Sequence, residues 1–139
     1  MKVSIITVCL NNAETVEDTI VSVKQQDHDD IEHIIIDGGS TDQTLEIVNK
    51  HHASISRVIS EKDNGIYDAM NKGLKFATGD IIGFLNSDDV YANDNVIGKI
   101  VDAIKNNNVD CCYGNLEYVA LKNPEEKIRI WMSKSNQDD

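Results

Sequence analysis

The alternation of strand-like and helix-like segments is the feature that most limits the fold of this chain. Short apolar runs rich in Val and Ile recur between segments of helical periodicity, starting with the first residues. This order is typical of a parallel sheet whose connecting helices cover both faces. We therefore predict an α/β fold with a mostly parallel sheet, with strands at Val3–Leu10, Ile34–Ile36, Arg57–Ser60 and Ile81–Leu85.

Helical segments separate and follow these strands. Ser40 with Gln43 three residues later has the form of a capping box, which predicts the start of the second helix. Asn93 is the expected N-cap of the last helix, and Gly73 predicts close packing of the third helix on the sheet. Apolar or small residues at helical spacing place the other helices at Val16–Val23, Ile66–Ala77 and Val96–Ile104.

The last thirty residues read differently. Asp110–Asn115 is expected to be a further strand, and a β-hairpin follows. Its strands are predicted at Leu116–Leu121 and Lys127–Trp131, and its turn at Asn123-Pro124-Glu125-Glu126. Residues 1–132 are thus expected to form one domain, and residues 133–139 a polar tail.

Acidic residues outnumber basic ones by 24 to 13, which gives a formal net charge of −11 at pH 7. This excess argues against a nucleic-acid or anionic-membrane surface as a partner. An anionic substrate would need a bridging cation. Solubility is the alternative explanation of the net charge taken alone.

The cysteines and histidines suggest no site. Cys9, Cys111 and Cys112 have neither metal-ligand spacing nor an even disulfide framework, which indicates a reducing, cytoplasmic compartment. The first apolar run is too short to cross a membrane, so no integral membrane segment is expected. The histidines are predicted to lie in solvent on loops or helix ends; they are His28, His33, His51 and His52.

The run from Gly83 to Asp89 leads an apolar strand directly into two adjacent carboxylates. Asp88 and Asp89 should emerge at the carboxyl end of a buried strand, where open α/β sheets bind ligands. Adjacent carboxylates repel each other unless a cation or proton neutralises them, and their hard oxygens suit Mg²⁺ or Mn²⁺ holding a phosphate. The alternative is an Asx-rich turn that caps the next helix.

Asp37 ends the second predicted strand, at the same sheet edge as Asp88. Its carboxylate can accept a hydrogen bond from a nucleobase or a ribose hydroxyl. An Asp before Gly38 and Gly39 is equally well explained as a turn residue. The chain has neither G-x-G-x-x-G after the first strand nor G-x-x-x-x-G-K-[ST], which disfavours a nicotinamide or ATP enzyme.

Four blocks carry a resemblance: VSIITV from Val3, IDGGSTDQT from Ile36, DNGIYDAMNKG from Asp63 and FLNSDD from Phe84. In this order and spacing, they resemble the donor-binding half of a family 2 glycosyltransferase. The segment Tyr113-Gly114-Asn115 with the following hairpin resembles the next part of the same enzymes.

The resemblance implies a GT-A (Rossmann-like) fold, a nucleotide-diphospho-sugar donor, expected to be a UDP-sugar, and Mn²⁺ or Mg²⁺. Mapped by position, Thr7 and Asn11 would border the base pocket, Asp37 would contact the base, and Asp63 would lie near the nucleoside. Asp88 would be the last acid of the family's D-x-D motif and the main metal ligand.

The chain departs from the family pattern at two positions. Asn86 replaces the first acid of the D-x-D motif, so Asp89 is expected either to serve as the second metal ligand or to cap the loop. Met70 stands where many members carry Arg, and Lys72 is near in sequence but half a helical turn away.

The implied reaction is inverting transfer of the sugar to a saccharide or lipid-linked acceptor in surface polysaccharide synthesis, with a carboxylate as general base. That base is expected beyond Asp139, so we expect a donor-binding fragment that is inactive alone, from an enzyme that is cytoplasmic or peripheral to the inner membrane face. The alternatives are a non-catalytic nucleotide-sugar-binding module and a nucleotidyltransferase. The latter should carry a Gly-rich basic loop where this chain has Asn11-Asn12-Ala13-Glu14.

Overall fold

The computed structural model describes residues 1–120 and 123–133, and the side chains of 124 and 125 lie outside this description. The chain divides into two compact units, Met1–Asp102 and Ala103–Asp139. Within the described ranges, no helix has both the length and the apolar character needed to cross a membrane.

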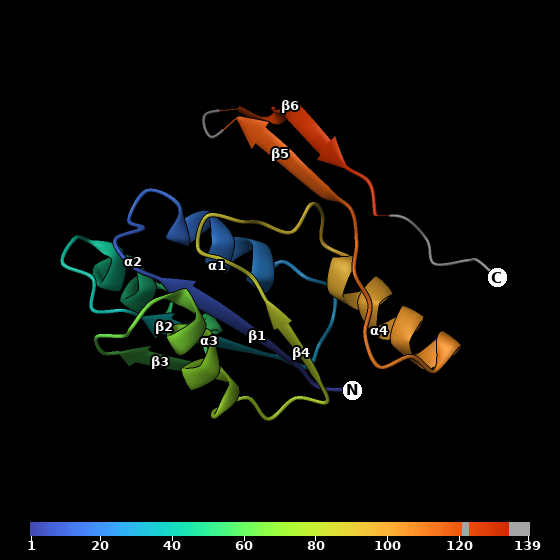
Figure 1. Cartoon of the computed structure of the whole chain (residues 1–139), viewed down its shortest axis with the longest axis horizontal. Helices are drawn as coiled ribbons and strands as arrows, with labels where there is room; N and C mark the ends of the chain where they lie inside the picture. Colours follow the sequence, from blue (N-terminus) through green and yellow to red (C-terminus); the bar gives the residue numbers. More distant parts are fainter. Residues whose placement is uncertain (121–122, 134–139) are drawn as a thin grey trace. The chain divides into compact units, whose positions relative to one another are not determined.

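The first unit is built on a four-stranded, fully parallel sheet with the strand order β3-β2-β1-β4. Figure 1 shows β1 running through the sheet between β2 and β4. The bounds are β1 Val3–Cys9, β2 Ile31–Asp37, β3 Arg57–Ser60 and β4 Ile81–Phe84. All four predicted strands and their parallel arrangement are confirmed, and β2 begins three residues before its predicted start.

Helices cover both faces of this sheet, as predicted. Ile6 and Val8 of β1 pack with Ile34 of β2 and Ala69 of α3 on one face. The opposite face carries α1, α2 and the start of α4, because β-strand side chains alternate between faces. The helices are α1 Val16–Lys24, α2 Thr44–Lys50, α3 Ile66–Leu74 and α4 Val96–Asn107, with a short 3₁₀ helix at His52–Ser54.

Two apolar clusters fill the face that carries α1. Val3 and Ile5 pack with Val23, Leu85, Ile97 and Val101, and Cys9 packs with Val16, Ile20, Ile35 and Val48. Each fully buried aliphatic side chain stabilises the fold by roughly 1.5–3 kcal/mol through burial. Cys9 is therefore the core residue predicted from the sequence.

Gly73 allows α3 to lie directly on the sheet. A β-carbon added at this position would come within 2.5 Å of Ile6 Cγ2. The predicted close packing of this helix is confirmed, since any larger residue would push α3 away from β1.

Two predicted helix caps are wrong. Ser40 Oγ accepts a hydrogen bond from Asn11 N (2.8 Å) instead of capping α2, whose N-cap residue Gln43 makes no side-chain cap bond. Asp42 takes that role, since its Oδ1 accepts from Thr44 N at 3.0 Å. Asn93 Oδ1 accepts from Asn95 N (3.3 Å) in a turn before α4. Ser40 is thus used by the neighbouring loop at Asn11 and Asn93 by a local turn, so neither side chain is free to cap its helix.

The second unit contains the predicted antiparallel hairpin, formed by β5 Leu116–Ala120 and β6 Asn123–Trp131. The predicted turn is wrong, because Asn123 to Glu126 belong to β6; residues 121 and 122 lie outside the described ranges.

The predicted strand at Asp110–Asn115 is also absent. No described strand pairs with that segment, and an extended segment without a partner lacks ladder hydrogen bonds. Cys111 and Cys112 are exposed there.

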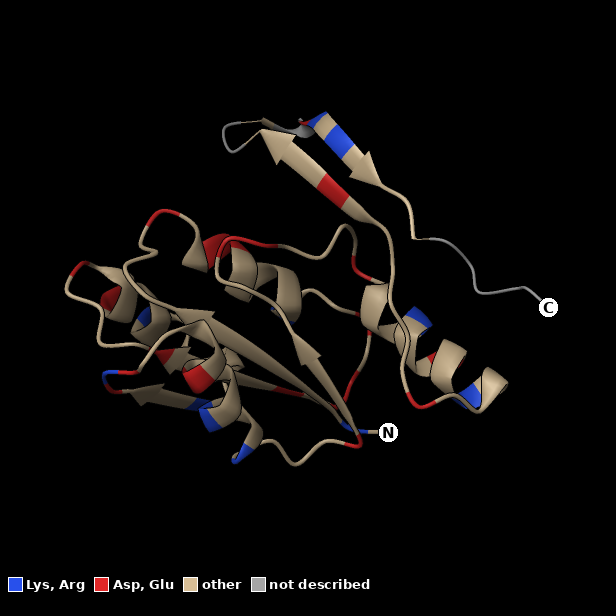
Figure 2. Ribbon diagram, in the orientation of Figure 1, with Lys and Arg blue, Asp and Glu red and all other residues tan. Residues whose placement is uncertain are grey.

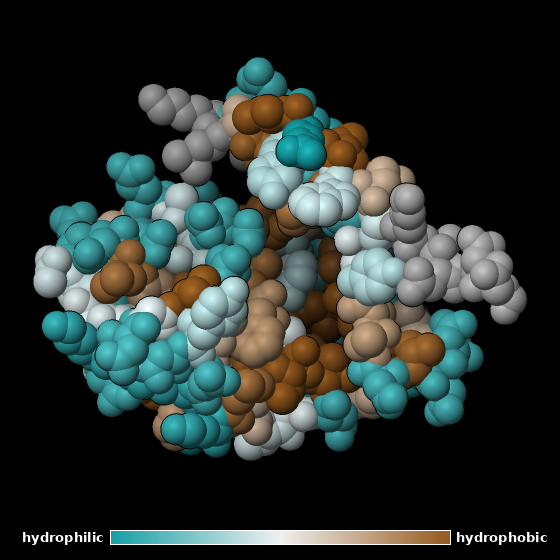
Figure 3. All heavy atoms as spheres, viewed as in Figure 1, coloured by the Kyte–Doolittle hydropathy of each residue, from teal (hydrophilic) through white to brown (hydrophobic). Residues whose placement is uncertain are grey.

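Much of the hairpin's apolar surface is exposed. Figure 3 shows brown, hydrophobic atoms on the hairpin. The exposed large apolar side chains of both strands and the residue after them are Leu116, Tyr118, Ile128, Ile130, Trp131 and Met132.

Candidate functional site

A cleft of about 370 Å³ lies in the first unit at the carboxyl ends of β1 and β4. Three segments line it: the end of β1, the start of α3, and the loop after β4. This is the edge at which open α/β sheets bind their ligands. The lining residues are Val8, Cys9, Leu10 and Asn12, then Asp63, Gly65, Ile66 and Ala69, then Asn86, Ser87 and Asp88.

The cleft combines apolar walls with a few polar groups. Leu10 and Ile66 are half-exposed aliphatic side chains from different segments. Asp63 and Asp88 supply the two carboxylates of the lining. Figure 2 shows that acidic residues are frequent in the loops of this unit. A mainly apolar cleft with a few oriented polar groups is typical of a small-molecule site.

Asp63 reaches the cleft from the loop between β3 and α3. Its Oδ1 accepts a hydrogen bond from Gly65 N at 2.9 Å, which closes a tight turn just before the helix. The structure therefore brings Asp63 and Asp88, two of the predicted donor-binding residues, to one cleft.

The loop after β4 holds the candidate metal ligands. No described residue donates a hydrogen bond to the Asp88 carboxylate, which is exposed. Asn86 Nδ2 donates to Asp89 Oδ2 at 3.2 Å, and Asp89 N donates to Asn86 O at 3.1 Å. Burial and the charge of Asp88 raise the pKa of Asp89. Asn86 to Asp89 thus form a backbone turn, with Asp89 beside Asn86 and Asp88 in the cleft. This turn does not cap the next helix, because α4 begins only at Val96.

Asn86 Oδ1 is buried and has no hydrogen-bond partner among the residues that the structure describes. A buried unsatisfied oxygen costs about 1–3 kcal/mol. An amide oxygen next to a carboxylate is a donor set that a divalent cation accepts. No cluster of three or more His, Cys, Asp or Glu side chains suited to a metal occurs among the described residues. Asn86 Oδ1 and the Asp88 carboxylate are therefore the protein oxygens that would hold a divalent cation at this cleft.

Asp37 does not line the cleft. It is completely buried, and its Oδ2 accepts hydrogen bonds from Gly39 N (3.1 Å), Ser40 N (3.1 Å) and Ser60 Oγ (2.7 Å). Cys9 Sγ lies 3.8 Å from Oδ1, and burial together with the Asp37 charge raises the pKa of the Cys9 thiol to about 12. These contacts favour the turn interpretation of Asp37; direct contact with a base stays a prediction.

Thr7 and Asn11 were expected to border the base pocket, and neither lines the cleft. Thr7 is completely buried, and its Oγ1 lies 3.0 Å from His33 Nε2. Because strand side chains alternate between faces, Val8 faces α3 and Thr7 points to the opposite face of the sheet. Asn11 has a positive φ of 55°, and its Oδ1 accepts from Thr41 N at 2.9 Å. Asn11 thus holds two loops together.

His33 is the one histidine whose predicted environment is wrong. It lies in β2 and is buried, and its Nδ1 has no partner in the described part of the chain. Burial lowers the pKa of His33 to about 4, so it is neutral at pH 7. The sequence signal for this was its position just before three isoleucines, inside the apolar run of β2.

Several lining residues were not predicted as site residues. Asn12, Gly65 and Ile66 border the cleft, and Ser87 lies between Asn86 and Asp88. The Asp-Asn-Gly turn after β3 was the available signal, since the residues that follow a strand at this edge face the ligand.

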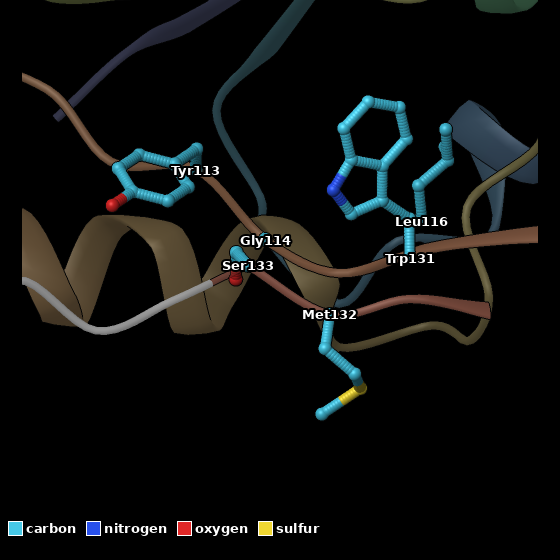
Figure 4. A pocket seen from close by; sticks show the side chains of 6 residues that line it. All are labelled: Tyr113, Gly114, Leu116, Trp131, Met132 and Ser133. Carbon is cyan, nitrogen blue, oxygen red and sulfur yellow. The ribbon is translucent and has the colours of Figure 1, made fainter.

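A second pocket, of about 400 Å³, lies within the second unit. Figure 4 shows Trp131 and Leu116 on one side of the hairpin and Met132 on the other, with Tyr113, Gly114 and Ser133 nearby. Arg129 lies 6.0 Å from the Trp131 ring. This pocket contains none of the predicted site residues.

Comparison with known proteins gives two informative relatives. An uncharacterized glycosyltransferase of Mycobacterium tuberculosis is 38% identical over 103 residues, which are 73% of this chain and 39% of the relative. A PGL/p-HBAD biosynthesis glycosyltransferase of Mycobacterium bovis is 33% identical over 117 residues, which are 81% of this chain and 46% of the relative. The chain thus spans less than half the length of these relatives.

Solved structures of GT-A glycosyltransferases share the fold, which confirms the predicted fold class. TarS of S. aureus, residues 1–349 in complex with UDP, matches with a TM-score of 0.73 and 29% identity over 79% of this chain and 34% of that one. Glucosyl-3-phosphoglycerate synthase of Mycobacterium tuberculosis, crystallised with Mn²⁺, UDP and glucosyl-3-phosphoglycerate, matches with a TM-score of 0.59 and 25% identity over 75% of this chain and 39% of that one.

The family comparison covers almost the whole chain. The model of the family described as glycosyl transferase family 2 matches residues 4–138. Together with the parallel sheet, the cleft at its carboxyl edge and the relatives above, this match confirms the resemblance seen in the four sequence blocks. The chain belongs to glycosyl transferase family 2.

Proposed function

We propose that this chain binds the nucleotide-diphospho-sugar donor, a UDP-sugar, of a metal-dependent inverting glycosyltransferase. The acceptor is a saccharide or a lipid-linked acceptor in surface polysaccharide synthesis. The observation that carries the proposal is the cleft at the carboxyl edge of the sheet, which Asp63, Asn86 and Asp88 share. UDP bound in the TarS structure supports the choice of donor.

The proposed pose follows from the lining. The nucleoside lies between the end of β1 and the start of α3, where Leu10 and Ile66 offer apolar contact and Asp63 can accept hydrogen bonds. The diphosphate lies toward the loop after β4. In a chain of net charge −11, the negative diphosphate is repelled by Asp88 unless a cation lies between them.

Asp88 and Asn86 Oδ1 are the proposed ligands of that cation, Mn²⁺ or Mg²⁺. Asp89 contributes by fixing Asn86, since it accepts the amide hydrogen bond that turns Oδ1 away from it. When bound, the cation neutralises the charge that grows on the departing nucleoside diphosphate. The Mn²⁺ complex of glucosyl-3-phosphoglycerate synthase supports this choice.

Transfer requires three coupled bond changes. The acceptor oxygen bonds to the anomeric carbon, the bond from that carbon to the diphosphate oxygen breaks, and a carboxylate takes the acceptor proton. Asp63 and Asp88 are assigned to the donor and the cation, so neither is the proposed base.

Titration calorimetry with UDP tests the proposal. We expect binding in the presence of MnCl₂ and at least about tenfold weaker binding when a chelator replaces the metal, because the bridging charge is lost. GDP is the matched control ligand for base preference. Equal affinity with and without metal would remove the cation from the proposal, and absence of binding would refute the donor site.

An assay of sugar transfer from UDP-sugars decides between an enzyme and a binding module. A protein that contains this chain and transfers sugar in a metal-dependent manner supports the proposal. Nucleotide binding without turnover in every such protein would favour the non-catalytic module.

A further inference from the structure

The loop between β3 and α3, residues 61–65, is held by the partly buried ammonium group of Lys72 on α3. Lys72 Nζ, on α3, lies 3.0 Å from Glu61 Oε1 and donates to Lys62 O at 3.1 Å. It also lies 3.5 Å from Asp68 Oδ2. The Lys72 side chain is only 17% exposed, whereas that of Lys50, in an exposed ion pair on α2, is 63% exposed. The Lys72 ammonium group thus donates to the backbone of this loop and forms ion pairs with Glu61 in the loop and Asp68 on α3.

Asp68 extends the same network to the other side of the loop. Its Oδ2 accepts a hydrogen bond from Asn64 N at 3.0 Å. The hydrogen bond to Glu61 raises the pKa of Lys72, and the bond from Asn64 N lowers the pKa of Asp68, so both side chains are charged at neutral pH. Lys72 and Asp68 together hold the residues on both sides of Asp63.

Asp63 itself has little freedom on its inner side. A β-carbon added at Gly38 would lie only 2.5 Å from Asp63 Oδ2, so this oxygen rests on the Gly38 backbone. Its other oxygen accepts from Gly65 N. The direction in which Asp63 faces the cleft therefore depends on where the loop is held.

We infer that Lys72 is a positioning residue for the nucleotide-sugar donor, acting through Asp63. This rests on the proposed function of the cleft. Lys72 does not line the cleft, and its ammonium group is already paired with Glu61 and Asp68, so it does not substitute for the arginine that Met70 replaces as a direct diphosphate contact. Its effect on the donor is indirect, through the conformation of residues 61–65.

The first measurement follows the loop without nucleotide. In Lys72→Met, which keeps the length and loses the charge, we expect amide hydrogen exchange at Asn64 and Gly65 to accelerate by about tenfold, because the loop loses its anchor. Lys50→Met, which breaks an ion pair of the same i, i+4 spacing away from the cleft, is the matched control and should leave both amides unchanged. Lys72→Arg should restore most of the protection.

The second measurement is a double-mutant cycle on UDP affinity with MnCl₂. Lys72→Met should weaken binding by about tenfold in the wild-type background and by less than about twofold in Asp63→Asn, because the two residues act through one contact. A general structural role would instead weaken binding equally in both backgrounds.

The outcomes separate this inference from the function on which it rests. If the wild-type protein binds no UDP, the proposed function fails and the inference fails with it. If wild type binds UDP but Lys72→Met leaves the affinity or the exchange at Asn64 unchanged, or if the two substitutions are additive, only the inference is overturned.

Discussion

The two edges of the parallel sheet use carboxylates in opposite ways. At the amino edge, Glu32 accepts hydrogen bonds from Ser4 Oγ (2.6 Å), Thr78 N (2.8 Å) and Lys2 Nζ (3.0 Å). At the carboxyl edge, Asp88 faces a cleft and receives no hydrogen bond from any residue in the described ranges. A carboxylate saturated by protein donors stabilises the fold, whereas one with free acceptor capacity is available to a cation or ligand.

Asp37 shows that lying at the carboxyl edge does not by itself make a carboxylate available to a ligand. It ends β2 at the same edge as the cleft, yet its side chain is buried and bonded to Gly39, Ser40 and Ser60. Asp37 therefore resembles Glu32 in its bonding and Asp88 only in its place in the topology. Hydrogen-bond saturation separates the two classes of carboxylate better than location does.

The largest effect is expected for Asp88→Ala. Metal-dependent UDP binding should weaken by roughly 100-fold, about 2.7 kcal/mol, because the principal cation ligand is lost. The free energy of unfolding should change by less than about 0.5 kcal/mol, since the side chain is exposed. Calorimetry and urea denaturation measure the two quantities. If Asp88→Ala lowered the stability but not the UDP affinity, Asp88 would stabilise the fold, as Glu32 does, and would not bind the ligand.

Asp37→Asn should do the reverse. Replacing one carboxylate oxygen by an NH₂ group leaves donors facing donors, which should lower the free energy of unfolding by about 1–3 kcal/mol. UDP affinity should change by less than about threefold if Asp37 only holds its turn. Urea denaturation with parallel calorimetry checks this. A large loss of affinity at unchanged stability would instead support the direct base contact predicted from the sequence.

Glu32→Gln tests the amino edge through pH. Burial raises the pKa of Glu32, but hydrogen bonds from Ser4, Thr78 and Lys2 outweigh burial and lower it from 4.5 to about 2. The unfolded chain therefore binds the proton first as pH falls. The stabilisation from Glu32 is complete above about pH 4.5 and decreases as pH drops toward 2.

We therefore expect Glu32→Gln to destabilise the protein by about 1–2 kcal/mol at pH 7, and this difference from wild type to shrink below pH 4. Urea denaturation at several pH values measures it. His33, which also titrates on unfolding, is present in both proteins and cancels. Glu46→Gln, in an exposed ion pair with Lys50, is the control and should cost under about 0.5 kcal/mol. If the stability difference between wild type and Glu32→Gln did not change with pH, the role assigned to the ionised Glu32 carboxylate would be wrong.

Asn86→Asp is expected to have the smallest effect. It restores an acid at the first position of the metal motif, so Mn²⁺-dependent UDP binding should tighten by about three- to fivefold. The gain is limited because a third carboxylate beside Asp88 and Asp89 also repels the diphosphate. Calorimetry measures it. An unchanged affinity would favour Asp89 as the effective second ligand.

The sequence predicted the elements of the first unit well, because hydrophobic periodicity is a local property. The four strands and the helices appear close to their predicted bounds, and Gly73 packs on Ile6 as expected. Predictions that depended on a partner from a distant segment of the chain were less reliable. Ser40 was assigned to its own helix but bonds to Asn11, and Asp110–Asn115 has no described strand to pair with.

For the site, the sequence by itself determined that acidic residues would follow the strands and that the family motifs were present. Tertiary structure alone decided which of these residues share the cleft. Asp63 and Asp88 do, whereas Thr7 is bonded to His33 and Asp37 to Ser60. The physical reason is that a polar side chain is available to a ligand only when no protein group satisfies it, and its partners come from segments distant in the sequence, such as those at 33 and 60.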